Sequence, residues 1–231
     1  MSYKLKMPGL LSGHFDIREE DNLQDFWSSS WKSIDPERIE KYVRDFNMEP
    51  DEIIAYLHAQ MVKTVCDAGC GCGAYALKLV KNGFMVSGFD LSEDAVKIAG
   101  ELLEKASVNV ELKTASVLYT GYPDDLFDCV ISRDVIDHMT KHSARLAIQE
   151  LYRITKPGGI LIVTLDQLDA EYQLEIHTVT GDGDYVFTDG KWKGMVFHPY
   201  SKTEALELIP HGAVLQIEEK DGLILKVKKP A

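Results

Sequence analysis

The stretch Val65-Cys-Asp-Ala-Gly-Cys-Gly-Cys-Gly-Ala74 decides the fold. A short apolar run ends in an acid, three alternating glycines follow, and an amphipathic pattern begins at Tyr75. This order predicts a buried strand, a tight loop and the N-terminus of a helix. Glycine lets the backbone turn sharply or lie against a ligand, and a helix N-terminus offers free N–H groups and positive potential. The stretch therefore predicts a binding site for a small molecule.

The bulk composition limits what else the chain can be. Its 231 residues suffice for one large domain or a domain with appendages, and 45% hydrophobic and 27% charged residues are typical of a globular protein. The net charge of -12 argues against nucleic acid as a partner, because that affinity rests on Lys and Arg. No apolar run reaches the roughly 20 residues that cross a bilayer, so no membrane partner is expected. Residues 1–11 lack the features of a secretory signal, and we expect a cytoplasmic protein.

The four cysteines do not indicate a disulfide framework, since three of them crowd one loop. A metal site is not expected, because the paired C-x₂-C spacing of zinc sites is missing and no histidine is near in sequence. Cys66 and Cys129 are interpreted as small buried residues of strands. Cys70 and Cys72 are interpreted as loop residues whose backbone matters more than their sulfur.

Strand and helix patterns alternate from residue 63 to residue 165, which is typical of a parallel sheet with helices on both faces. After the apolar run before Asp67, further strands are expected at 85–89, 108–113, 127–132 and 160–165. Helices are expected at 74–81, after Ser92 and at 143–154. Two more runs, 214–219 and 223–228, flank Lys220-Asp221-Gly222 and predict a β-hairpin. The predicted fold class is α/β: a three-layer, doubly wound, mostly parallel seven-stranded sheet with an antiparallel C-terminal hairpin strand.

The segments around this core are predicted to belong to the same single domain, 1–231. Residues 1–34 are expected to be irregular and rich in aromatic side chains. Helix starts at Asp35-Pro36-Glu37 and Pro50-Asp51-Glu52 make 1–62 a helical cap or flank of the core at 63–165. The polar, glycine-rich segment 166–200 is expected to contain a hairpin and to cover the substrate side. Residues 201–231 would then supply the closing helix and hairpin.

Two ligands fit a strand, glycine loop and helix with an acid after the next strand. Gly69-x-Gly71-x-x-Ala74 matches the dinucleotide fingerprint, and Asp90 lies near the offset of about 20 residues for a ribose-binding acid. Asp67 distinguishes the two ligands. A carboxylate at that place repels the pyrophosphate of a dinucleotide but attracts the α-ammonium group of S-adenosylmethionine, whose sulfonium adds a second cation. Asp67 therefore favours S-adenosylmethionine.

Four motifs in one order carry a resemblance to a known family. They are Thr64-Val-Cys-Asp-Ala-Gly-Cys-Gly-Cys-Gly73, Gly88-Phe-Asp-Leu-Ser92, Asp125-Leu-Phe-Asp-Cys-Val-Ile-Ser132 and Leu151-Tyr-Arg-Ile-Thr-Lys-Pro-Gly-Gly159. With their spacing, residues 64–165 resemble the class I S-adenosylmethionine-dependent methyltransferases of small-molecule type. The resemblance implies a Rossmann-like methyltransferase fold, S-adenosylmethionine as cofactor and S-adenosylhomocysteine as product. It also implies methyl transfer by direct displacement, which needs no covalent intermediate with the enzyme.

The resemblance also implies which residues contact the cofactor. Asp67 would bind the methionine ammonium group, the glycine loop would approach the ligand, and Asp90 would accept both ribose hydroxyls. Gly73 would mainly allow close packing of helix and strand. Ser116 departs from the family, because an acid that binds the adenine amino group stands there in many relatives. The expected cofactor contacts are Asp67, Gly69, Cys70, Gly71, Asp90, Leu91, Ser116, Val117 and Arg133.

The acceptor is less well determined by the sequence. The candidate lining residues of the substrate pocket are Trp27, Trp31, Asp134, Phe197 and His198. Asp134 is a candidate base, with a surface salt bridge or a helix cap as the alternative. His138 is expected to be structural, and no catalytic residue is named. A small-molecule acceptor is preferred over a protein side chain, while an NAD-binding oxidoreductase and a non-catalytic S-adenosylmethionine-binding protein remain as alternatives from other classes.

Overall fold

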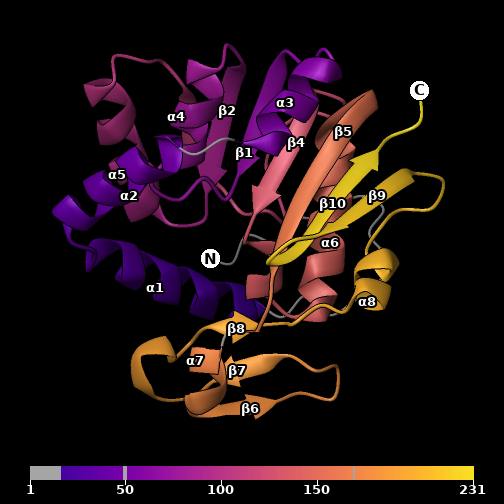
Figure 1. The fold of residues 1–231 in the computed structure, drawn as a ribbon. Helices are drawn as coiled ribbons and strands as arrows, with labels where there is room; N and C mark the ends of the chain where they lie inside the picture. The colour runs from indigo at the N-terminus through magenta and orange to yellow at the C-terminus, as the bar shows by residue number, and fades with distance from the viewer. Residues whose placement is uncertain (1–16, 49–50, 169) are drawn as a thin grey trace, which may run out of the picture.

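The computed structural model describes residues 17–48, 51–168 and 170–231 and contains the predicted seven-stranded sheet (Figure 1). The strand order is β3-β2-β1-β4-β5-β10-β9, and only β10 and β9 run antiparallel to their neighbours. The strands are β1 (Thr64–Ala68), β2 (Met85–Asp90), β3 (Glu111–Thr114), β4 (Phe127–Arg133), β5 (Thr155–Asp166), β9 (Val214–Glu219) and β10 (Gly222–Lys228). The predicted fold class is confirmed.

Helices cover both faces of this sheet and make the three predicted layers. One face packs on α3 (Glu52–Ala59) and α4 (Ala74–Lys81) through a core that includes Leu57, Leu79 and Ile131. The other face packs on α6 (Lys141–Ile154) and α8 (Lys202–Glu207). Next to α4 lie α2 (Pro36–Met48) and α5 (Glu93–Lys105), which share an apolar cluster with it. The central strands β4 and β5 are buried on both faces, as parallel strands between two helix layers are.

The strand order reverses between β1 and β4, where chain crossovers leave in opposite directions. The middle of β1 pairs in parallel with both neighbours, since Asp67 aligns with Gly88 of β2 and with Ile131 of β4. The β1–α4 loop and the loop from β4 into the short helix η1 (Ile136–His138) both leave at carboxyl ends of strands. Ligands of open parallel sheets bind at such a switch point.

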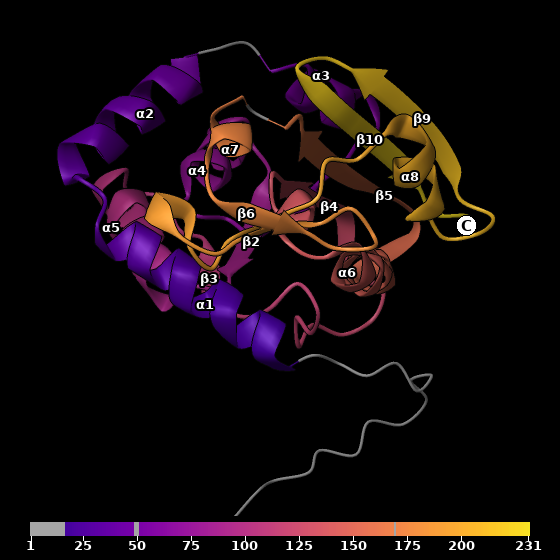
Figure 2. The ribbon, with the colours of Figure 1, turned by 90° about the horizontal axis from the view of Figure 1, so that it is seen from below.

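The N-terminal segment differs from the prediction, because residues 17–32 form a regular helix, α1 (Ile17–Lys32). The prediction of an irregular segment was wrong there. Leu23, Phe26 and Trp27 recur at helical spacing and turn toward the protein, so burial of this stripe stabilises the helix. In both ribbon views α1 runs across the carboxyl ends of the strands (Figures 1 and 2). The prediction for residues 1–11 and the aromatic Phe15 lie outside the described residues.

The segment after β5 contains the expected hairpin and one strand more. Helix α7 (Ala170–Leu174) precedes a small antiparallel sheet in the order β6-β7-β8, made of β6 (His177–Val179), β7 (Tyr185–Phe187) and β8 (Val196–Phe197), with η2 (Gly190–Trp192) before β8. This small sheet lies below the carboxyl ends of the main-sheet strands and next to α1 (Figures 1 and 2). Phe26 of α1 packs into its apolar cluster with Phe187, Met195 and Phe197. Residues 166–200 therefore hold α1 in place.

Two strand boundaries also differ. Strand β5, expected at 160–165, begins already at Thr155 and so includes Lys156-Pro157-Gly158-Gly159, and its register with β4 shifts between Phe127 and Cys129. A Cβ on Gly159 would lie 2.8–2.9 Å from two backbone oxygens, so only glycine fits there. The edge strand β3 begins at Glu111 and not at residue 108. Among the described residues, no helix combines the length and the apolar character needed to cross a membrane.

We predict that Asp128→Asn lowers the free energy of unfolding by about 1–2 kcal/mol at pH 7, because Asp128 joins three strands. Its carboxylate accepts the N–H groups of Lys63 and Thr64 and pairs with Lys156 at 2.7 Å. Burial opposes ionisation, but these donors outweigh it and lower the pKa of Asp128 to about 2. The folded pKa lies below the unfolded one, so this stabilisation is present above about pH 4 and is lost as the pH falls toward 2.

Urea unfolding at several pH values checks this prediction. Asp124→Asn is the matched control, because Asp124 is exposed and pairs with Arg153 at the surface. An equal loss for Asp124→Asn and Asp128→Asn would contradict the prediction.

Candidate functional site

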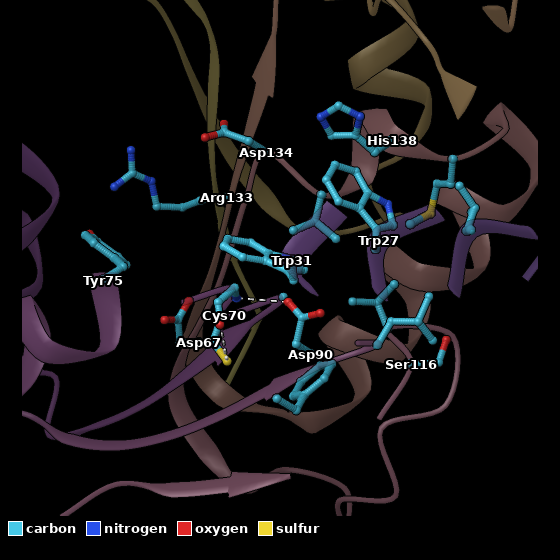
Figure 3. Close-up of a pocket in the computed structure, with 18 of the residues that line it drawn as sticks. Trp27, Trp31, Asp67, Cys70, Tyr75, Asp90, Ser116, Arg133, Asp134 and His138 are labelled. Carbon is cyan, nitrogen blue, oxygen red and sulfur yellow. Dashed lines mark hydrogen bonds between the residues drawn. The ribbon is translucent and has the colours of Figure 1, made fainter. Parts of the chain in front are cut away.

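A pocket opens at the carboxyl ends of β1, β2 and β4 and is covered by α1 (Figure 3). The structure brings together there every predicted cofactor contact and three of the predicted substrate residues. These lining residues are Trp27, Trp31, Asp67, Gly69, Cys70, Gly71, Asp90, Leu91, Ser116, Val117, Arg133 and Asp134. Further lining comes from other aromatic and apolar side chains, among them Leu23, Tyr42, Phe46, Tyr75, Val135, His138, Met139, His142 and Leu146.

The glycine loop between β1 and α4 forms the floor of the pocket. Gly69 and Gly71 have φ of +80° and +51°, a region that favours glycine. Added Cβ atoms would lie 2.4 Å from a methyl of Val135 at Gly69 and 2.9 Å from the Trp31 ring at Gly71. Gly73 has a different role from the predicted packing of helix on strand, since its Cβ would meet Ala99 of α5 at 2.9 Å. The lack of a Cβ atom at Gly73 lets α4 and α5 approach each other.

Asp90 lies at the end of β2 with both carboxylate oxygens facing backbone donors. The Gly71 N–H donates to Oδ2 and the Ser92 N–H to Oδ1, each at 2.9 Å. Ser92 itself caps α5, because its hydroxyl accepts the N–H of Ala95. Burial raises the pKa of Asp90, and the backbone donors act against that rise. Each oxygen keeps lone-pair capacity for one more donor from a ligand.

Asp67 is buried and has an oxygen without a partner. Its Oδ2 makes no hydrogen bond to any described residue, although the pocket lies beside it. Burial raises the pKa of Asp67 to about 7, and Asp90 adds to the rise, while Arg133 and the backbone N–H of Ala76 lower it. A buried carboxylate without a full set of donors is costly, so this arrangement favours a cationic ligand.

Arg133 lies at the end of β4, between two aromatic rings. Its guanidinium stands 5.1 Å from the Phe46 ring centre and 4.6 Å from the Tyr75 ring centre. Within the described chain no carboxylate forms an ion pair with Arg133, and its buried Nε and the buried Tyr75 hydroxyl have no hydrogen-bond partner. The pocket therefore has a free carboxylate oxygen, a free guanidinium and a free hydroxyl at one end.

The end beyond Asp90 is mostly apolar. Phe89, Leu91, Val117 and Leu118 line it. Ser116 stands where the resemblance places an acid in many relatives. Its hydroxyl accepts the Leu118 N–H at 3.1 Å, so the O–H remains available as a donor.

A third part of the pocket lies under α1, where Trp27 contacts His138. Their rings meet edge to face with centres 5.0 Å apart, and Figure 3 shows the imidazole next to the indole. Asp134, with φ of +55°, is tied to β5, because its carboxylate accepts the Thr164 hydroxyl and its N–H bonds the same Thr164 oxygen. Among the contacts of the described residues, Asp134 forms neither a surface salt bridge nor a helix cap, the two structural alternatives to a role as a base.

Comparisons with known proteins identify the core around this pocket. The sequence profile of the methyltransferase domain family matches residues 65–159. The match covers the core of the chain, from β1 into β5. Over 101 residues, 43% of the chain, this protein is 38% identical to the 2-methyl-6-phytyl-1,4-hydroquinone methyltransferase of Synechocystis. Over 170 residues, 72% of the chain, it is 25% identical to the ubiquinone biosynthesis O-methyltransferase of Coxiella burnetii.

The chain spans about half the length of the curated relatives it matches, 31% and 66% for these two. A solved structure, the Burkholderia thailandensis 1,6-didemethyltoxoflavin-N1-methyltransferase with bound 1,6-didemethyltoxoflavin and S-adenosylhomocysteine, matches with a TM-score of 0.67 at 16% identity. That match covers 100% of this chain and 94% of the other. At this identity the likeness shows a shared fold.

Two of the predicted substrate residues do not line the pocket. Phe197 is fully buried in the apolar cluster under the small sheet. His198 is also buried, and its Nδ1 pairs with the Asp184 carboxylate at 2.8 Å. Both residues are in or next to β8, whose side chains fill the space between the small sheet and the core. Packing therefore explains them, and the prediction of pocket contacts is corrected.

Several residues that line the pocket were not predicted from the sequence. Tyr42 and Phe46 recur at helical spacing on α2, a pattern typical of a buried stripe, yet both line the pocket and Tyr42 is exposed. Tyr75 directly follows the glycine loop, which was the available signal for a pocket position. Val135 and His142 follow the β4 motif and carry no distinctive spacing.

Proposed function

We propose that the protein is an enzyme that transfers a methyl group from S-adenosylmethionine to a small-molecule acceptor. The observation that carries this proposal is the unpartnered Oδ2 of buried Asp67 in the same pocket as the Arg133 guanidinium, whose charge lowers the pKa of Asp67. An ammonium group alone would satisfy Asp67 but would be repelled by Arg133. An α-amino acid end supplies a cation for Asp67 and a carboxylate for Arg133, so the zwitterion satisfies both. The cofactor has this end, and a dinucleotide does not.

The other cofactor residues follow from the same placement. Asp90 would accept the two ribose hydroxyls on the lone pairs that Gly71 and Ser92 leave free. The apolar walls at Leu91 and Val117 would contact the adenine ring, and the Ser116 hydroxyl would supply one polar contact. Gly69, Cys70 and Gly71 would present backbone to the ligand. These assignments are part of the proposal.

When bound, S-adenosylmethionine supplies an activated methyl group. The residues of the chain bind, orient and exclude water, and for a direct displacement such positioning accounts for much of the rate enhancement. Trp31 lies against Gly71 and Trp27 lies over His138, so α1 shields both parts of the pocket from water. One of the two relatives is named for a hydroquinone and the other for ubiquinone biosynthesis, which supports a small-molecule acceptor. We also propose a cytoplasmic location on the evidence of composition.

Ligand-induced thermal stabilisation tests the proposal against its alternatives. S-adenosylmethionine and S-adenosylhomocysteine are expected to raise the melting temperature, and NAD is not. Stabilisation by NAD alone would support an oxidoreductase and overturn the proposal. Release of methyl label from S-adenosylmethionine into a small-molecule extract separates an enzyme from a non-catalytic binding protein, and label recovered in protein would favour the side-chain alternative.

A further inference from the structure

The ends of neighbouring strands place three polar pocket residues in a row. Asp90 ends β2, and its partner in the sheet is Thr114, the last residue of β3. The chain leaves β3 beside Asp90, because the Ala115 N–H donates to the Asp90 backbone oxygen at 2.9 Å. Ser116 therefore lies on the side of Asp90 that faces away from Asp67, and Figure 3 shows the three side chains in this order.

This row sets the direction of the ligand under the proposed function. Asp67 and Arg133 bind the methionine end and Asp90 binds the ribose, so the base extends past Asp90 to Ser116. Neighbouring strands lie about 4.8 Å apart, and the row from β4 through β1 and β2 to β3 therefore spans about 14 Å. That length suits a nucleoside that is joined through sulfur to an amino acid.

The base end of the pocket has no carboxylate among the described lining residues. The acids that line the pocket are Asp67, Asp90 and Asp134. Asp134 belongs to the opposite end, because it follows β4 and its carboxylate accepts the hydroxyl of Thr164 in β5. The apolar lining residues at the base end are Phe89, Leu91, Val117 and Leu118. A base that extends past Asp90 meets no further charged acceptor there.

An acid does hold the loop after β3, but it is turned away from the pocket. Glu150 of α6 accepts the N–H and the hydroxyl of Thr120 through Oε1, at 2.8 Å and 2.6 Å. Its other oxygen pairs with Arg153 at 2.7 Å. Glu150 does not line the pocket, so the loop is held in place without presenting an acid to the ligand.

Ser116 carries the polar side-chain group at the base end. Its hydroxyl oxygen accepts the Leu118 N–H at 3.1 Å, which fixes the position of the oxygen and uses one lone pair. The O–H donor and a second lone pair remain. A hydroxyl turns either to donate or to accept, while an ionised carboxylate only accepts. A carboxylate at this place would select an amino group, and a hydroxyl does not.

The loop at Ser116 also lies close to the protein surface. Ser116 is half-buried, and Tyr119, whose N–H donates to the Ser116 carbonyl at 3.1 Å, is 63% exposed. A ligand amino group that points there keeps water as its hydrogen-bond partner, so exchanging it for another group changes the binding energy little.

We propose that the cofactor site binds the purine ring without reading its 6-amino group: Ser116 donates its hydroxyl to ring nitrogen N1, and apolar contacts hold the rest of the base. This inference rests on the proposed function, and it adds the residue that sets the specificity for the base. Sites with a buried polar partner for one ligand group reject analogues that lack this group, and sites without such a partner do not. The protein therefore accepts cofactors whose purine is changed at position 6.

Two ligands test the inference without requiring turnover. Calorimetry on the full chain compares S-adenosylhomocysteine with its 6-deamino counterpart, in which purine replaces adenine and N1 is kept. The two dissociation constants are expected to agree within about threefold, because no hydrogen bond to a charged group is lost. A larger preference for S-adenosylhomocysteine overturns the inference.

Two variants of Ser116 test its position and its hydrogen bond. Ser116→Asp places a carboxylate beside the 6-amino group, so S-adenosylhomocysteine is expected to bind at least about tenfold more tightly than the 6-deamino ligand. Ser116→Ala is expected to weaken both ligands equally, by about three- to tenfold, since both contain N1. Equal binding of the two ligands by Ser116→Asp, or a loss confined to S-adenosylhomocysteine in Ser116→Ala, overturns the inference.

Tyr119→Asp is the matched control for the added charge. Tyr119 belongs to the same loop but is exposed and does not line the pocket, so this variant is expected to show no preference between the two ligands. Each comparison is a ratio of two affinities on one protein, and a partly unfolded sample therefore leaves it unchanged. A preference of equal size in Tyr119→Asp and Ser116→Asp overturns the assignment to Ser116.

The result also distinguishes the two proposals. If S-adenosylhomocysteine does not bind the unmodified protein, the proposed function fails and the inference fails with it. If it binds, its affinity depends on Asp90 and the 6-deamino ligand binds much more weakly, only the inference about Ser116 fails.

Discussion

Asp90→Ala is expected to weaken the binding of S-adenosylhomocysteine by at least about 100-fold. Two ribose hydroxyls would lose a charged acceptor, and hydrogen bonds to charged groups contribute about 1.5–3 kcal/mol each. The substitution also frees the N–H groups of Gly71 and Ser92, which now donate to the carboxylate at 2.9 Å. The glycine loop would then lose one of the hydrogen bonds that hold it toward β2, while those from Gly69 and Cys70 to the Phe89 carbonyl remain. Titration calorimetry measures the loss directly.

Asp94→Asn is the matched control for this prediction. Asp94 is another acid in the same region of the chain, in the first turn of α5, and it does not line the pocket. Its substitution is expected to leave affinity within about twofold. Unchanged binding in Asp90→Ala would refute the ribose assignment, and equal losses in both variants would indicate a general loss of negative charge.

Local sequence was sufficient to predict those pocket residues whose backbone conformation and side-chain chemistry both leave a mark in the sequence. The glycine loop and Asp90 could be predicted because a turn with positive φ requires glycine and because the acid ends a strand beside that turn. Asp67 could be predicted for a similar reason, as a charge at the end of a buried strand needs a partner. In each case the relevant neighbours are close in sequence or in an adjacent strand.

The covering elements could not be predicted in the same way. Trp31 reaches Gly71 only because α1 crosses the carboxyl ends of the strands, and that path depends on the small sheet packing against Phe26. Phe197 and Tyr42 also show that the position of an aromatic residue in the sequence does not determine whether it lines the pocket. An aromatic residue in a polar segment proved to be buried packing, and an aromatic residue in a helical stripe proved to line the pocket. Tertiary contacts decide such cases, and the spacing of residues does not.

The affinity for S-adenosylhomocysteine is expected to rise with pH between about 6 and 7.5 and then to level off. Burial raises the pKa of Asp67 to about 7 in the free protein. An ammonium group binds the ionised carboxylate, so below pH 7 binding must release a proton, and affinity falls by up to about tenfold per pH unit. Asp67→Asn is expected to remove this slope and to weaken binding at pH 8 by about 10- to 100-fold. Calorimetry in buffers of different ionisation enthalpy counts the released protons.

The stability of the free protein is expected to change with pH in the opposite direction. The folded pKa of Asp67 lies above its unfolded value of 3.8, so its contribution to stability is fully present below about pH 4 and is lost as the pH rises through 7. Burial also raises the pKa of Asp137 to about 7, which gives the same sign, but Asp137 does not line the pocket. Asp137→Asn is therefore the matched control: it should reduce the pH dependence of unfolding and keep the pH dependence of ligand binding.

Because the bound ammonium group offsets the cost of ionised Asp67 alone, S-adenosylhomocysteine should raise the melting temperature more at pH 8 than at pH 6. A ligand-induced shift that is independent of pH in this range would show that Asp67 does not face the ammonium group.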